Sequence, residues 1–161
     1  MPASAKFISS ALVTGLVAGA LDLTAAVVVY DSTYVRVLRF IARGFFTKEE
    51  SAKADQAMIW WGLLFHFLIA VVFSFFYFTL YPRVRFMRKH ILLSAVLLGL
   101  FVWIVMNMIV LPLSQFNTPV IPADKSEALK SAAILIVCIG LPISFGAWLF
   151  YKKGKSVPHG Q

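Results

Sequence analysis

Asp22 and His66 are the residues best suited to chemistry, because each lies inside a long apolar stretch of the chain. Asp22 falls within residues 7–30, where a carboxylate costs about 2.5–3.5 kcal/mol on insertion scales and so requires a partner in the protein. His66 lies in the next apolar stretch and is the partner we expect. A carboxylate and an imidazole side by side can share a proton and titrate near physiological pH.

Asn107, in the third apolar stretch, has a similar predicted depth. At a helical rise of about 1.5 Å per residue, Asp22 and His66 lie about 12 Å from the outer ends of their helices, and Asn107 lies about 9 Å from its own. The same level of the fourth stretch contains Gly140 and Pro142, which allow close backbone approach and weaken helical hydrogen bonding. We therefore predict a polar cluster of Asp22, His66 and Asn107 in the outer half of the protein, which binds a ligand or protons.

Each of these residues also has a purely structural interpretation. Asn107 could donate an interhelical hydrogen bond, and His66 could satisfy the carbonyl or hydroxyl group of a neighbour. Gly15 and Gly19 form a small-residue stripe of the kind that lets helices approach closely. We expect this stripe to pack against helices of the same chain rather than to drive dimerisation.

Enzyme chemistry has little support in the sequence, so we predict a protein that is not an enzyme and name no catalytic residue. His90 and His159 lie far from the level of His66, and Cys138 is one turn away from that level. We therefore predict no metal site and no cofactor within one chain. A haem held by two imidazoles would need His66 from two subunits, and the chain contains no nucleotide-binding or nucleophile-elbow motif.

The elements that must position these residues follow from the composition of the chain. Of the 161 residues, 60% are hydrophobic and 14% are charged. A soluble core of this length cannot bury so much apolar surface, so the excess faces lipid. We predict an all-α, polytopic membrane four-helix bundle, one domain over residues 1–161, with four spans of sufficient length. These spans are residues 7–30, 58–81, 91–113 and 132–151.

A short amphipathic helix is predicted between the first two spans, over residues 34–46. Arg36, Arg39 and Arg43 recur at helical spacing on one side of it, which is typical of a helix in the membrane interface. Gly44 then ends or bends it. The three arginines are either an anchor to lipid headgroups or part of a lid over a polar cavity between the spans.

Two sequence patterns predict helix starts outside the membrane. Thr47 and Glu50 match a capping box, so the second helix is expected to begin near Lys48. Asp124, followed by Glu127, is expected to cap the fourth helix in a similar way.

The charge distribution gives the orientation and the partners. One side of the predicted bundle has eight Lys and Arg residues and no acid, and the other side has seven Lys and Arg residues. The eight are Lys6, Arg83, Arg85, Arg88, Lys89, Lys152, Lys153 and Lys155. The positive-inside rule therefore favours cytoplasmic N- and C-termini. We expect anionic lipid headgroups at the basic loop and at the C-terminus. Nucleic acid is not expected, and a homo-oligomer or a membrane partner remains open.

Several segments resemble a group of bacterial four-span inner-membrane proteins described as YagU-like. These segments are Gly15–Asp22, Arg36–Gly44, His66–Ala70, Met106–Ser114 and Gly140–Ile143. The resemblance implies a multi-pass protein of the bacterial cytoplasmic membrane with a compact four-helix unit. It implies no reaction.

The leading functional hypothesis is an integral membrane protein that binds or passes protons or a small solute through the polar cluster. The alternative is a structural or partner subunit of a membrane complex, in which the cluster only fixes helix packing. A haem- or metal-binding membrane enzyme is the third hypothesis.

Overall fold

The computed structural model describes residues 3–47, 49–50, 55–113 and 124–155, and every regular element in these ranges is a helix. Four helical segments are long and apolar enough to cross a membrane: Ser4–Val29, Gln56–Leu80, Ile91–Val110 and Lys125–Lys152. The prediction of an all-α bundle with four membrane-type helices is confirmed. The fourth segment begins earlier than residue 132, because its first two turns are polar and extend beyond the apolar run.

The first half of the chain contains two spans and the helix between them. The first span is α1 (Ala3–Val29), and α2 (Tyr34–Arg43) follows after a short turn. The second span is α4 (Asp55–Leu80), and the short α5 (Arg85–Lys89) connects it to the third. The predicted amphipathic helix is thus present, and its C-cap is Gly44, as expected from the sequence.

Each span of the second half is interrupted by a π-helical turn. The segments in chain order are α6 (Ile91–Val105), η1 (Met106–Val110), α7 (Leu111–Leu113), α8 (Lys125–Leu135), η2 (Ile136–Gly140) and α9 (Leu141–Lys155). In both spans a proline comes two residues after the π-helical turn, Pro112 in one and Pro142 in the other. Proline has no N–H and clashes with the carbonyl four residues earlier, and a wider turn relieves this clash.

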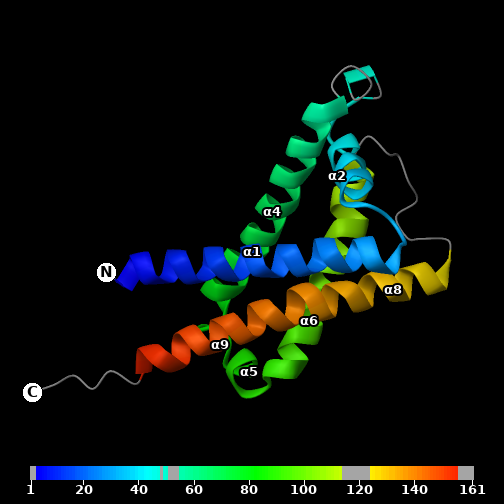
Figure 1. Ribbon diagram of the computed structural model, residues 1–161. Helices are drawn as coiled ribbons and strands as arrows, with labels where there is room; N and C mark the ends of the chain where they lie inside the picture. The colour runs from blue at the N-terminus through cyan, green and yellow to red at the C-terminus, as the bar shows by residue number, and fades with distance from the viewer. Residues whose placement is uncertain (1–2, 48, 51–54, 114–123, 156–161) are drawn as a thin grey trace, which may run out of the picture.

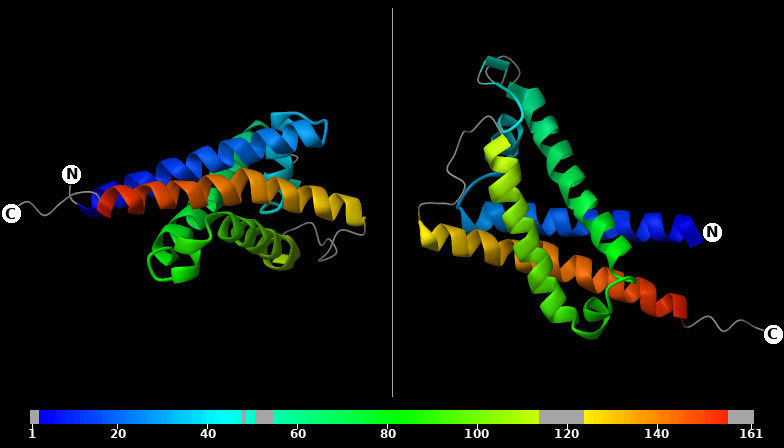
Figure 2. Two further views of the ribbon diagram at one scale, coloured as in Figure 1. Left: turned by 90° about the horizontal axis from the view of Figure 1, so that it is seen from below. Right: turned by 180° about the vertical axis from the view of Figure 1, so that it is seen from behind.

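The four spans form two crossing layers (Figures 1 and 2). α1 lies alongside the continuous α8–η2–α9 segment and runs antiparallel to it, while α4 and α6 cross these two helices on the other side. α4 and α6 splay apart from the end where α5 joins them (Figure 2, left). The two described ends of the chain lie near each other, away from α2.

Glycines set the closest approach between the third and fourth spans. A Cβ atom on Gly99 would collide with the backbone of Ile136, and one on Gly140 would collide with the carbonyl oxygen of Ala95. Helices in lipid gain little from the hydrophobic effect when they associate, so close backbone packing of this kind is a main source of their affinity.

Hydroxyl groups join helices that are distant in the sequence. Three such hydrogen bonds, each 2.8 Å long, link Ser74 Oγ to the Ala11 carbonyl, Tyr77 Oη to Ser94 Oγ, and Tyr151 Oη to the Phe78 carbonyl. Bonds of this kind contribute about 0.6 kcal/mol each in a membrane bundle. They fix which faces of α1, α4, α6 and α9 meet.

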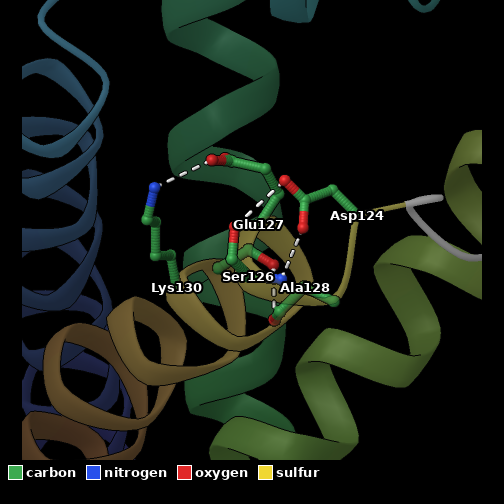
Figure 3. Close-up of polar contacts among 6 residues, drawn as sticks. Asp124, Ser126, Glu127, Ala128 and Lys130 are labelled. Atoms are coloured by element: carbon green, nitrogen blue, oxygen red, sulfur yellow. Dashed lines mark hydrogen bonds and ion pairs between the residues drawn. The ribbon is translucent and has the colours of Figure 1, made fainter.

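Both predicted helix caps are present. The Thr47 backbone N–H donates to Glu50 Oε2 at 2.9 Å, and the Glu50 N–H donates to Thr47 Oγ1 at 3.3 Å. Asp124 accepts the Ser126 N–H at 2.8 Å at the start of α8 (Figure 3). The predicted start of the second helix near Lys48 falls partly on residues 48 and 51–54, which lie outside the described residues.

The Asp124 cap gives a testable pH dependence. The N–H and hydroxyl of Ser126 both donate to this carboxylate and hold its pKa below the ordinary value of 3.8. Because the folded-state pKa is lowered, the stabilisation is present above pH 3.8 and is lost as the pH falls through the folded-state value. We expect faster amide exchange at the start of α8 in acid. Asp124→Asn, which caps without titrating, should remove this pH dependence; exchange equally acid-sensitive in that variant would contradict the assignment.

Candidate functional site

Asp22 on α1 and His66 on α4 meet inside the membrane-type bundle. His66 Nε2 lies 4.0 Å from Asp22 Oδ2, and the two side chains are 12% and 18% exposed, respectively. His66 Nε2 also lies 2.8 Å from the carbonyl oxygen of Gly19, one turn before Asp22. Because a carbonyl can only accept, His66 Nε2 carries a proton and donates it to Gly19.

This hydrogen bond determines how His66 can take up a proton. A neutral imidazole with its hydrogen on Nε2 has an unprotonated Nδ1, which can accept a second proton. The resulting imidazolium would keep its hydrogen bond to Gly19 and would face the Asp22 carboxylate. The structure therefore brings a carboxyl group and an imidazole, two groups that can each bind a proton, to within 4.0 Å of each other.

Small residues on α1 make this approach of the two helices possible. A Cβ atom on Gly19 would lie 3.0 Å from Phe67 Cδ1 and 3.1 Å from Ala70 Cβ. A Cβ atom on Gly15 would lie 2.8 Å from Val71 Cα. The small-residue stripe thus packs against α4 of the same chain, and it brings the Gly19 carbonyl within reach of His66.

Helix α2 lies against α4 next to the pair, at the end of the bundle opposite α5. A Cβ atom on Gly62 would collide with the carbonyl group of Leu38, so the backbones of α2 and α4 touch there. Gly62 precedes His66 by one turn on the same face of α4. Leu38 and Ala42 are buried in this contact. α2 therefore covers the end of the site that is farthest from α5.

The three arginines of α2 do not all have the same environment. Arg36 and Arg43 are exposed, whereas Arg39 is partly buried. The aromatic residues that follow α2 pack on α4: the ring centroids of Phe45 and Phe65 are 4.1 Å apart, and those of Phe46 and Trp61 are 5.7 Å apart. This packing fixes the C-terminal end of α2 to α4.

The fourth span brings Cys138 to the level of Asp22. A Cβ atom on Gly146 would touch Thr14, so these two residues lie opposite each other. α1 runs antiparallel to the fourth span. Eight residues after Thr14 is Asp22, and eight residues before Gly146 is Cys138, so Asp22 and Cys138 lie at the same level. From the sequence alone, Cys138 is expected one helical turn away from the level of His66. The α1–α9 register, which cannot be read from the sequence, places it beside the pair.

Asn107 is not brought to the pair. Its Nδ2 donates to the Trp103 carbonyl of its own helix at 2.8 Å. Gly99 faces Ile136 in the antiparallel packing of α6 on η2, so Asn107, eight residues farther on, lies about 12 Å beyond that contact along the axis. The expected depth of Asn107 was counted from the end of its apolar run, which assumes that all four helices end at the same level. The helices instead cross at an angle, and α6 is displaced along its axis.

Gly140 and Pro142 lie on the fourth span close to Cys138. Gly140 ends the η2 turn and contacts α6, and Pro142 is partly buried just after it. The π-helical turn itself was not predicted. A recurring pattern could have indicated it, because Ile109-Val-Leu-Pro-Leu113 and Ile139-Gly-Leu-Pro-Ile143 are similar, and each contains the end of a π-helical turn.

Among the described residues, no group of three or more His, Cys, Asp or Glu side chains lies close enough together to hold a metal ion.

The fold and the site define a helical protein of the multi-pass membrane type with an ionisable pair between its first two spans. Comparison of the chain with protein-family models, with curated proteins and with solved structures finds no match.

The contact between Gly62 and Leu38 predicts a way to open the site. Gly62→Val should displace α2 and admit water to the pair, because the added side chain meets backbone atoms that cannot turn away. Cys138 is the only cysteine in the chain and reports on this access. We expect N-ethylmaleimide to label Cys138 several times faster in Gly62→Val than in wild type. Leu64→Val, a change at an exposed position of α4, serves as the control, and equal rates in all three proteins would contradict the covering role of α2.

Proposed function

We propose that this chain is an integral membrane protein that binds and passes protons at the Asp22–His66 pair. The observation that supports the proposal most directly is the position of His66 Nε2, 2.8 Å from the Gly19 carbonyl and 4.0 Å from Asp22 Oδ2. This arrangement leaves Nδ1 as the proton acceptor and provides a nearby counter-charge for the protonated ring. An ionisable pair inside a membrane bundle is typically part of an ion or proton pathway.

The close packing around the pair favours a proton over a larger solute. The glycine contacts of α1 with α4, and of α2 with α4, bring backbone to within van der Waals distance on both sides of His66. A proton can be transferred between side chains with little movement of the helices. A solute of several heavy atoms would require them to separate.

For the location, we propose the bacterial cytoplasmic membrane, with both termini in the cytoplasm. The basic residues of α5 and of the C-terminal end support this orientation through the positive-inside rule. The resemblance to YagU-like proteins remains a prediction that agrees with this location.

Proton flux in proteoliposomes tests the proposal. Vesicles containing a pH-sensitive dye and the purified protein are given a potassium gradient and valinomycin, which set the membrane potential. The protein should accelerate the change in internal pH relative to protein-free vesicles. A rate equal to that of protein-free vesicles would contradict proton passage.

A structural role is the second candidate, and one observation favours it. The hydrogen bond from His66 to Gly19 joins α1 directly to α4, so the pair could serve only to fix the packing of these helices. This hypothesis predicts that substitutions at the pair lower stability and leave proton movement unchanged.

A further inference from the structure

A groove between α4, α5 and α6 lies at the opposite end of the bundle from α2. One cavity of about 260 Å³ is lined by apolar and aromatic side chains together with Tyr77 and Ser94: Phe76, Tyr77, Leu80, Phe86, Met87, Ser94, Leu97, Leu98 and Phe101. A second cavity of about 280 Å³ shares Phe76 and Leu80 with it and also contains Arg83 in its lining. The two cavities therefore adjoin along one side of α4. α4 and α6 splay apart from the end where α5 joins them (Figure 2, left), and residues of all three helices line the first cavity.

The inside of the groove is suited to a hydrocarbon chain. The hydroxyl groups of Tyr77 and Ser94, which line the cavity, bond to each other at 2.8 Å, and Ser94 also bonds to the Ile91 carbonyl, so their polar groups are satisfied without a ligand. Phe101 lies ten residues from the start of α6, about 15 Å along the helix, which is the depth of one leaflet. One acyl chain of a membrane lipid has this length and chemistry.

The mouth of the groove is positively charged. Arg83, Arg85, Arg88 and Lys89 are all exposed, and the chain contains no Asp or Glu between residues 56 and 123. Arg83 Nη1 donates to the Thr79 carbonyl, and Arg88 Nη1 donates to the Pro82 carbonyl at 2.7 Å. The first bond holds a guanidinium group that lines the second cavity, and the second holds the Arg88 guanidinium at Pro82, the residue before Arg83. Each bond uses one nitrogen of the guanidinium group. The remaining N–H groups are suited to the oxygens of a phosphate.

We propose that this groove binds an anionic phospholipid, with one acyl chain between α4 and α6 and its phosphate at Arg83 and Arg88. The site is separate from the Asp22–His66 pair and does not depend on proton passage. Charge complementarity selects an anionic headgroup, because the four cations have no carboxylate partner in this stretch of sequence. The apolar walls select a lipid rather than a soluble phosphate.

Native mass spectrometry of the detergent-purified protein tests this site. Phosphatidylglycerol and phosphatidylcholine with identical acyl chains are added separately. Wild type should retain one phosphatidylglycerol more tightly than phosphatidylcholine. The double variant Arg83→Gln, Arg88→Gln should bind phosphatidylglycerol about tenfold more weakly, the effect of losing roughly one charge-assisted hydrogen bond. The control Arg36→Gln, Arg43→Gln removes the same charge from α2 and should leave binding unchanged.

Two further measurements examine the apolar part of the site. Leu97→Trp fills the groove and should weaken phosphatidylglycerol binding, whereas Leu92→Trp, on an exposed part of α6 outside the groove, should not. Glycerol phosphate, which has no acyl chain, should not compete. Equal retention of both lipids, equal losses in the two double-arginine variants, or competition by glycerol phosphate would each overturn the proposal.

Discussion

Asp22→Asn should reduce proton flux in proteoliposomes to the level of protein-free vesicles and leave the protein folded. Asparagine keeps the shape of the side chain but has no negative charge, so it cannot stabilise a protonated His66 at a separation of 4.0 Å. The substitution also removes a charge that costs about 2.5–3.5 kcal/mol to place within a membrane helix. We therefore expect the thermal stability in detergent to stay the same or to rise.

A matched control is available at the end of the same helix. Asp31 is exposed just after α1 and has a backbone φ of 44°, a conformation that asparagine also adopts readily. Asp31→Asn changes the net charge by the same amount outside the pair and should leave flux unchanged. Full flux in Asp22→Asn together with a lower melting temperature would favour the structural candidate over proton passage.

Gly140→Val should be the most destabilising substitution in the second half of the chain. A Cβ atom at this position would meet the Ala95 carbonyl oxygen, and the bulk of valine would push η2 away from α6. Overpacking of a tight contact costs on the order of 3 kcal/mol, and here the colliding atoms belong to the backbone of both helices. The midpoint of unfolding in a detergent titration should therefore fall markedly.

The fourth span also provides the control for this change. Ala133→Val adds apolar volume at an exposed position of α8, only two turns before Gly140. We expect it to leave the unfolding midpoint nearly unchanged. A similar midpoint for Gly140→Val and wild type would mean that α6 and η2 do not pack as closely as described.

The number and type of the membrane-type helices followed from the sequence. Residues 7–30 and 58–81 can only be accommodated as helices in lipid, because an apolar segment of that length must satisfy its backbone internally. The positions of Gly44, Thr47 and Asp124 are equally local, since a cap or a turn depends on a few neighbouring residues. These features were predicted correctly.

Part of the site also followed from the sequence. Asp22 and His66 belong to consecutive spans joined on one side of the membrane, so equal distances from that side place them at equal depth. Their separation of 4.0 Å agrees with this reasoning. The role of the Gly19 carbonyl was not predictable, because it depends on the rotation of α1 and α4 about their axes.

The tertiary structure alone decided which residues join the pair from the later spans. Cys138 comes beside Asp22 because α1 and α9 pack antiparallel with Thr14 opposite Gly146, and Asn107 lies elsewhere because α6 is displaced along η2 by the Gly99–Ile136 contact. The sequence by itself determined the four membrane-type helices, the amphipathic helix and the ionisable pair, since these depend on hydropathy and on local spacing. Axial shifts and crossing angles depend on the contacts of many side chains at once, so only the folded molecule contains them.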